Sequence, residues 1–319
     1  MNNVPTDQLN INYDDEIDLR ELFHVLLDKI FYIGVITSIF SLISIIYALM
    51  TPNIYQSQAV MMPMDSSKGM SGMLGQYSGM ASLAGITLPS ESVSKAQEAI
   101  ARIQSFEFFS NSFLPNIKLE NLMAVKKWNQ ASNTLTYDAS DFDSESRQWV
   151  RKPKPPRSKI PSSQEAYEEY MEIMTVSENK KTLFVTLSIE HKSPFIAQQW
   201  VEIIMDQIDQ VMRVQDKQQA MQSITYLNSL VPTVNYEEIK EALFALQQEQ
   251  MKKLMMVEVN NNYIFKVLDS PITPELQSKP RRLLVIMWGT ILGMVLSILG
   301  VLTFHYTRKS SEHDETGFR

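Results

Sequence analysis

The sequence predicts an α+β protein in which two transmembrane helices flank one large α/β domain that carries a long projecting helical arm. Two apolar runs, Ile30–Met50 and Leu283–Tyr306, hold about 21 and about 24 residues without a charge, and about 20 residues are enough for a helix to cross the bilayer core. We therefore divide the chain into a cytoplasmic tail with the start of a helix at 1–29, a transmembrane helix at 30–50, an outer domain at 51–282, a second transmembrane helix at 283–306 and a short cytoplasmic tail at 307–319.

The cations around the two apolar runs give conflicting indications of topology. Arg20 and Lys29 precede the first run and only Lys68 follows it within reach, which favours a cytoplasmic N-terminus. Because the first helix usually dominates and long loops cross regardless of charge, we expect both termini in the cytoplasm. The second run opposes this arrangement, with Lys266, Lys279, Arg281 and Arg282 before it and Arg308, Lys309 and Arg319 after it.

The N-terminal part of the chain is expected to form a helix, a strand, a loop and a second helix. Asp18 and Glu21 have the spacing of a capping box, which predicts one continuous helix from about residue 19 to 50. Residues 54–62 read as a strand. Residues 66–86 hold five of the ten glycines, a density typical of a flexible loop, and three- and four-residue apolar steps predict a helix at 92–112.

The rest of the outer domain is expected to hold paired strands and two long helices. Prolines make residues 128–165 irregular, since proline disfavours both helix and central strand. Alternation of apolar and polar residues predicts paired strands at 171–177 and 183–190. Further elements are expected as a helix at 193–230 that begins at Pro194, a helix at 236–256 and a strand at 263–268.

The helix predicted at 193–230 is too long for a compact domain. It would measure roughly 57 Å, whereas a domain of about 230 residues has a diameter of about 45 Å. It must therefore project as an arm, and its apolar stripe needs a cover that we expect from neighbouring copies in a homo-oligomer. The candidate oligomer residues on this arm are Trp200, Ile204, Ile208, Val211, Met221, Ile224 and Leu227.

Catalytic and cofactor motifs are missing from the sequence. It has no HExxH, no GxSxG and no Gly-Lys dipeptide, and His191 is the one histidine of the outer domain. Catalysis and metal binding need several convergent groups, so we expect no enzyme, no cofactor and a structural role for His191. Met70 and Met73 have a spacing that could chelate copper, but an adaptable apolar loop explains them as well.

Two further segments are candidates for positioning. Gly289 and Gly293 form a GxxxG step in the second apolar run, and small residues at this spacing let membrane helices pack closely. The prolines Pro271, Pro274 and Pro280 form a stiff linker that could couple the outer domain to its membrane helix. A basic proline run at 151–161 could bind an anionic polymer or pair with the preceding acids, and no basic stripe indicates nucleic-acid binding.

Several segments, taken in order, resemble a known family. They are Asp18–Leu22, Trp149–Lys152 with Pro155 and Pro156, Ser188–Pro194, Gln199–Val201, Tyr263–Lys266, Pro271, Pro274 and Ser278–Arg281. With these segments, the chain is similar to Wzz-type chain-length determinants, the polysaccharide co-polymerases of bacterial inner membranes. One departure is that Gly293 is followed directly by Met294, where the family usually has two glycines before the methionine.

The resemblance implies a regulator of surface polysaccharide length, most often lipopolysaccharide O-antigen. It implies a periplasmic, membrane-proximal α/β base, a helical arm, a homo-oligomer and a Wzy-type polymerase partner, with possible contact to the lipid-linked polysaccharide. One alternative is a co-polymerase for capsule or exopolysaccharide export with a separate kinase, since the tail at 307–319 is too short for a kinase domain. The other is a Met-rich periplasmic metal-binding membrane protein.

Overall fold

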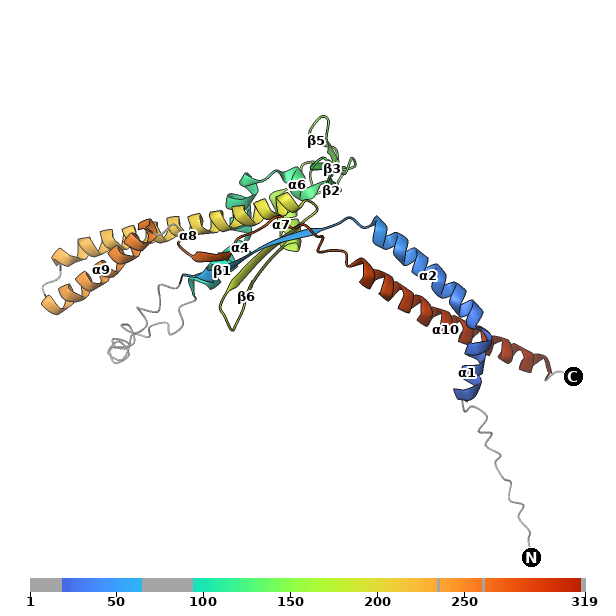
Figure 1. Cartoon of the computed structure of the whole chain (residues 1–319). Coiled ribbons are helices and arrows are strands. Elements are labelled where there is room, and N and C mark those ends of the chain that lie inside the picture. Colours follow the sequence, from blue (N-terminus) through green and yellow to red (C-terminus); the bar gives the residue numbers. More distant parts are fainter. Residues whose placement is uncertain (1–18, 65–93, 234–235, 260–261, 317–319) are drawn as a thin grey trace, which may run out of the picture. The chain divides into compact units, whose positions relative to one another are not determined.

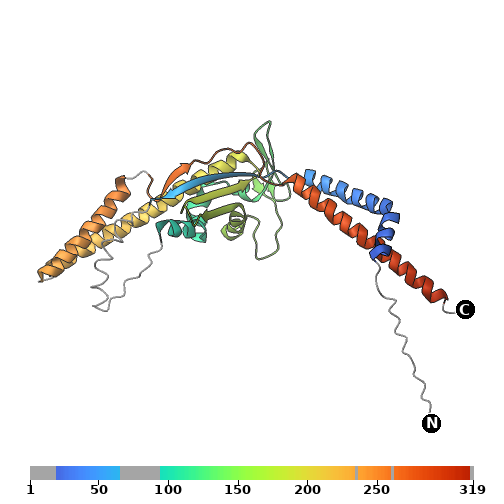
Figure 2. The ribbon, with the colours of Figure 1, turned by 60° about the horizontal axis from the view of Figure 1, so that its bottom comes forward.

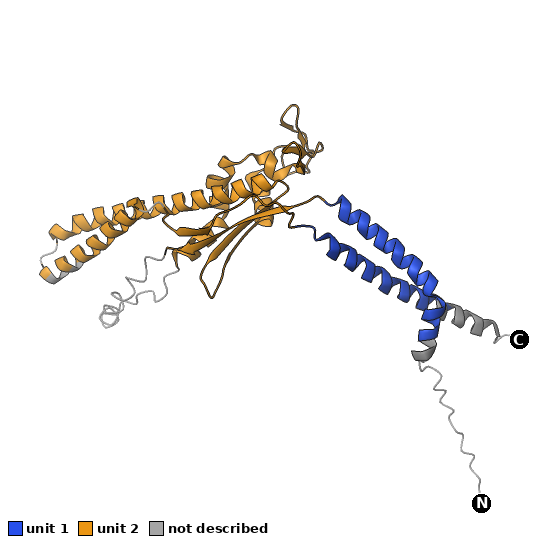
Figure 3. Cartoon of the chain, in the orientation of Figure 1, with its two compact units in different colours: residues 1–51, 279–319 blue, residues 52–278 orange. Residues whose placement is uncertain are grey.

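The computed structural model describes residues 19–64, 94–233, 236–259 and 262–316. The chain forms two compact units, which are considered separately. Unit 1 comprises Met1–Thr51 with Lys279–Arg319, and unit 2 comprises Pro52–Ser278 (Figure 3). The glycine-rich segment at 66–86 lies outside the described residues.

Unit 1 is helical and holds α1 (Leu19–Asp28), α2 (Ile30–Met50) and α10 (Arg282–Thr316). The segments Ile30–Met50 and Arg282–Phe304 are long and apolar enough to cross a membrane, and few of their residues are buried within the chain. An exposed, uniformly apolar surface of this length suits lipid contact rather than water. Helices α2 and α10 pack against each other along their length (Figure 1).

The prediction of one continuous helix over residues 19–50 is wrong. Lys29 leaves the helical region at φ −104° and ψ 12°, and α2 restarts with the Lys29 carbonyl accepting from the Tyr32 and Ile33 amides. The break falls where the sequence changes from an amphipathic to a uniformly apolar pattern. Helices of these two kinds face different surroundings, which explains a change of direction at this residue.

Unit 2 is built on a four-stranded antiparallel sheet. Strands β6 (Met174–Glu178), β7 (Val185–His191), β1 (Tyr55–Pro63) and β8 (Phe265–Asp269) follow one another in this spatial order. The register pairs Ala59 with Leu187 and Met62 with Lys266. The predicted strand at 171–177 begins only at Met174, because residues 171–173 end helix α7 (Ser163–Ile173), which a capping box of Ser162 and Glu165 starts.

One long helix covers a face of this sheet and continues beyond it. Helix α8 (Pro194–Leu230) has the predicted position and ends in a short 3-10 turn at Val231–Thr233. Helix α9 (Glu237–Val259) then returns along the C-terminal half of α8 (Figures 1 and 2). The two helices form the arm, which we define as residues 212–259.

The remaining elements close the core and form small hairpins. The helix predicted at 92–112 is shorter, because it stops at Ile103 and Ser105 caps a new turn. The hairpins β2 (Val125–Asn129) with β3 (Thr134–Tyr137) and β4 (Phe142–Asp143) with β5 (Gln148–Trp149) lie in the predicted irregular region. The helical segments are α4 (Lys95–Ile103), α5 (Phe106–Phe108), η2 (Phe109–Phe113), η3 (Leu114–Asn116) and α6 (Leu119–Met123).

Candidate functional site

The first half of α8 belongs to the core of its own chain. Trp200, Ile204 and Ile208 are buried against the sheet and the aromatic cluster of Phe109, Phe113 and Tyr170, and Val211 packs against the same core. These side chains are not accessible to a second copy, so their interpretation as part of an oligomer stripe is corrected. Periodicity could not separate the two roles, because a core face and an oligomer face have the same apolar spacing.

The arm itself exposes apolar side chains in unit 2. Met221 is 51% exposed, whereas Leu227 is buried and Ile224 is half-buried. An open hollow of about 490 Å³ runs along α8 and is lined by Met221, Gln222, Thr225, Tyr226 and Ser229. Other large apolar side chains exposed on the arm are Val214, Tyr236, Phe244, Leu246, Met251, Met255 and Val259.

A polar network holds the base of the arm. The buried Asp216 carboxylate accepts from the ammonium groups of Lys95 at 2.6 Å and Lys253 at 2.9 Å and from the hydroxyl of Tyr263 at 2.5 Å. Burial alone would raise the pKa of Asp216, but these hydrogen bonds outweigh it and hold the pKa below its usual value. The network therefore ties α4, α8, α9 and the chain leading into β8 together.

A second carboxylate, which precedes Asp216 on α8, anchors the segment that leads into β8. Asp209 accepts from the amides of Tyr263 at 2.8 Å and Ile264 at 3.1 Å. Arg213 pairs with Asp209 and donates to the Val257 carbonyl at 2.8 Å. In the sequence, the apolar pattern of this helix is interrupted at residues 213–219. The charged residues in that interruption are the one sequence feature that could have predicted this network.

The GxxxG step of α10 packs against α2 of the same chain. A Cβ atom built on Gly289 would lie 2.3 Å from the Ser44 hydroxyl, and one on Gly293 would lie 2.5 Å from the Phe40 Cβ. Only glycine allows this separation between the helices. Three hydroxyl contacts join the same faces: Thr290 to Ser41 at 3.3 Å, Thr37 to Ser297 at 3.4 Å and Ser44 to the Val285 carbonyl at 2.9 Å.

The predicted coupling prolines lie along and just after the edge of the sheet. Pro271 is buried, and Pro274 and Pro280 are partly buried. The chain between them is held to β1, since the Ser57 hydroxyl donates to the Ile272 carbonyl at 2.8 Å. Proline has no amide hydrogen and is tolerated at a sheet edge, so these residues fit the position without losing ladder bonds.

The basic proline run pairs with acids that follow it, rather than with the preceding ones. Arg151 donates to both carboxylate oxygens of Glu165, at 2.7 and 3.0 Å, and to the carbonyls of Ser158 and Lys159. The Arg151 guanidinium lowers the pKa of Glu165 to about 2. Arg157 also contacts Glu165. This segment is thus a loop closed by one bidentate ion pair.

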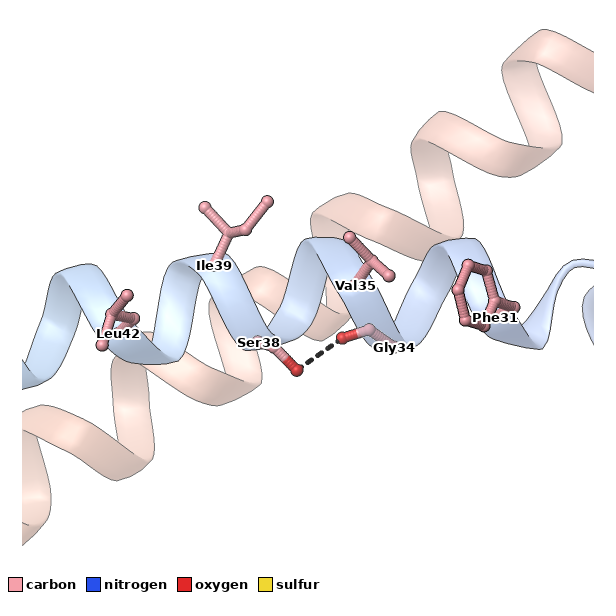
Figure 4. Close-up of a pocket in the computed structure, with 6 residues that line it drawn as sticks. All are labelled: Phe31, Gly34, Val35, Ser38, Ile39 and Leu42. Carbon is pink, nitrogen blue, oxygen red and sulfur yellow. Dashed lines mark hydrogen bonds between the residues drawn. The ribbon is translucent and has the colours of Figure 1, made fainter.

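Features that would indicate chemistry are sparse in the described part of the chain. It holds no group of three or more His, Asp or Glu residues that could bind a metal, and Met70 and Met73 lie outside the described residues. A hollow of about 480 Å³ on α2 is lined by one helix face of Phe31, Gly34, Val35, Ser38, Ile39 and Leu42 (Figure 4). Such an open, apolar surface suits packing or lipid contact rather than catalysis.

Comparisons with known proteins found one matching sequence family and a set of solved structures. The sequence family described as "Wzz: Chain length determinant protein" matches residues 15–111. No curated protein matches the sequence. A solved structure of a full-length bacterial polysaccharide co-polymerase is 13% identical with a TM-score of 0.41, covering 92% of this chain and 99% of that one. A fragment of WzzB, a polysaccharide co-polymerase from Salmonella Typhimurium, is 13% identical with a TM-score of 0.26, covering 71% and 100%.

Proposed function

We propose a function from one premise: the chain belongs to the Wzz family of chain length determinant proteins, which it matches over residues 15–111. It regulates the length of a surface polysaccharide, and the polysaccharide is lipopolysaccharide O-antigen. The observation that carries the proposal is the combination of this match with one α/β unit that bears a long arm and is joined to an apolar helix at each end.

The location follows from the two apolar helices. We place residues 30–50 and 283–306 across the bacterial inner membrane, the domain at 51–282 in the periplasm and the tails at 1–29 and 307–319 in the cytoplasm. The glycine contacts of α10 with α2 support a stable helical hairpin. In this role Gly289 and Gly293 fix the close packing of the two helices in the hairpin. Pro271, Pro274 and Pro280 form a stiff linker that couples the position of the domain to the second helix.

The chain acts as an oligomeric scaffold beside a Wzy-type polymerase, and it catalyses no reaction itself. The exposed apolar side chains of the arm support contact between copies. Met221 remains a candidate oligomer residue, and Phe244 and Tyr226 join it. The scaffold would hold the polymerase and the growing lipid-linked polysaccharide together until the polysaccharide reaches its preferred length.

Deletion and re-expression in the source bacterium tests this function. The expected result is that loss of the protein converts a clustered O-antigen ladder on a lipopolysaccharide gel into a random one, and that re-expression restores the cluster. An unchanged ladder together with a changed capsule would favour the alternative of a capsule co-polymerase. If ladder and capsule both stay unchanged, regulation of polysaccharide length is excluded.

A further inference from the structure

The segment that leaves β8 is held against the sheet as a strap, defined here as residues 270–278. Strand β8 pairs with β1 over residues 60–63 of β1, and the strap then follows the same edge of β1 toward Ile54. The Ser278 amide donates to the Ile54 carbonyl at 2.8 Å, and the Thr273 hydroxyl bonds Gln198 of α8. The strap backbone is therefore fixed near both of its ends.

Two large apolar side chains of the strap are nevertheless in contact with solvent. Leu276 is 84% exposed and Ile272 is 70% exposed. Removing such a side chain from water is favourable, and hydrogen bonds of the Ile272 carbonyl and the Ser278 amide hold the backbone that carries both side chains. Exposed apolar groups on an ordered backbone are typical of a surface that another phase or partner covers.

The length of the chain limits how far this surface can be from the candidate membrane span. About six residues separate Leu276 from Arg282, where α10 begins. Because an extended chain spans at most about 3.5 Å per residue, Leu276 lies within roughly 20 Å of that helix end. At the other connection, between α2 and β1, Ile54 lies about four residues after Met50, the last residue of α2. Both connections to the apolar helices thus leave from the edge that the strap covers.

The residues beside the strap have the composition of a membrane interface. Trp128 contacts Tyr55 and Phe195 with ring centroids 5.4 and 6.1 Å apart, and Phe195 is 49% exposed. Lys127 of β2 is exposed on the neighbouring hairpin. Tryptophan and tyrosine gather at the level of lipid headgroups, and nearby lysine and arginine side chains are attracted to anionic lipids.

We propose that the strap is a bilayer-contact surface, with Leu276 and Ile272 inserted at the boundary between the headgroups and the acyl chains of the membrane that α10 spans. The occupant is phospholipid rather than a second copy, because the prolines leave the strap without a regular ladder for pairing with another strand. The proposal rests on α2 and α10 crossing a membrane, which the proposed function also requires. It is independent of which polysaccharide is regulated.

The chain has no cysteine, so single cysteines can be labelled without altering the background. The full chain would be placed in nanodiscs of phosphatidylethanolamine and phosphatidylglycerol that contain no labelled lipid, lipids spin-labelled close to the headgroup, or lipids spin-labelled near the end of the acyl chain. Leu276→Cys and Ile272→Cys would each carry an environment-sensitive fluorophore. Met255→Cys is the matched control because Met255 is also apolar and exposed but lies on the arm, and Val295→Cys in α10 reports the membrane itself.

Quenching by the label close to the headgroup is expected at positions 276 and 272, several-fold stronger than at position 255, and quenching by the label near the end of the acyl chain is expected at position 295. Because all four parent side chains are exposed or on the lipid-facing surface, we expect the variants to keep the unfolding midpoint of the parent. Quenching at 295 but none above the control at 276 and 272 overturns the strap proposal alone. Shielding of 276 from aqueous iodide without lipid quenching assigns it to a protein partner and also overturns the proposal. No quenching at 295 overturns the membrane span as well.

Discussion

The hydrogen bonds of His191 determine its protonation state. Its Nδ1 accepts from the Ser193 amide at 2.9 Å, so the proton is on Nε2, which donates to the Asn121 carbonyl at 3.0 Å. The ring packs against Trp200 with centroids 5.0 Å apart. Burial lowers the pKa of His191 to about 4. The residue joins the end of β7 to α6 and the start of α8, in keeping with the structural role expected from the sequence.

The pH dependence of stability tests this assignment. The folded pKa of His191 lies below the unfolded value of 6.5, so the unfolded state binds more protons. Its contribution is fully present above pH 6.5 and is lost as the pH falls toward 4, by roughly 3 kcal/mol. His191→Gln should flatten the dependence of the unfolding midpoint on pH between about pH 4 and pH 6.5. Equal slopes in the parent and His191→Gln would contradict a neutral, buried His191.

At the scale of elements, much of the secondary structure could be predicted, but its environment could not. Helix α8 and the β6–β7 pair follow from periodicity and from the positions of proline. The break at Lys29 has no Gly or Pro to signal it. The burial of Trp200 and the ion pairs of Asp216 depend on residues distant in the sequence. Local patterns record which face is apolar, and only the tertiary fold decides what covers it.

The helix pair α2 and α10 gives the sharpest prediction for an element. Gly289→Ala would place a methyl carbon 2.3 Å from the Ser44 hydroxyl, and overpacking of this kind costs about 1–3 kcal/mol. We expect a lower thermal midpoint in detergent for Gly289→Ala and partial recovery in the double variant with Ser44→Gly. Gly300→Ala is the control, because nothing lies within 4 Å of the added Cβ. Equal midpoints for the two alanine variants would show that the helices can separate without cost.

At the scale of the whole molecule, the arm and the two apolar helices have separate tasks. The helices anchor the chain, and the arm presents apolar surface that the chain does not cover itself. Candidate oligomer contacts therefore move from the first half of α8 to the exposed residues of the arm. In the proposed function, the scaffold would act through the spacing between its copies.

A charge on the arm tests the assembly. Phe244→Glu places a carboxylate on an exposed apolar position of α9, and burying that charge between copies would cost several kcal/mol. We expect a lower mass in detergent and a shorter or less clustered polysaccharide distribution. Gln130→Glu adds the same charge at an exposed polar position in the turn between β2 and β3, outside the arm, and should leave both unchanged. A parent that is monomeric across a wide concentration range would exclude the oligomer.

Helix α8 also acts as a lever. It is a single rod whose first half is fixed in the core and whose second half, about 18 residues or roughly 27 Å long, extends into the arm. A tilt of about 10° at the base would move the tip by roughly 5 Å over that length. In the proposed oligomer, copies whose arm tips touch would each need nearly the same tilt at the base. The rod would then convert small differences in packing at Asp216 into the spacing between arm tips, so that residues far from any polysaccharide could adjust the length at which synthesis stops.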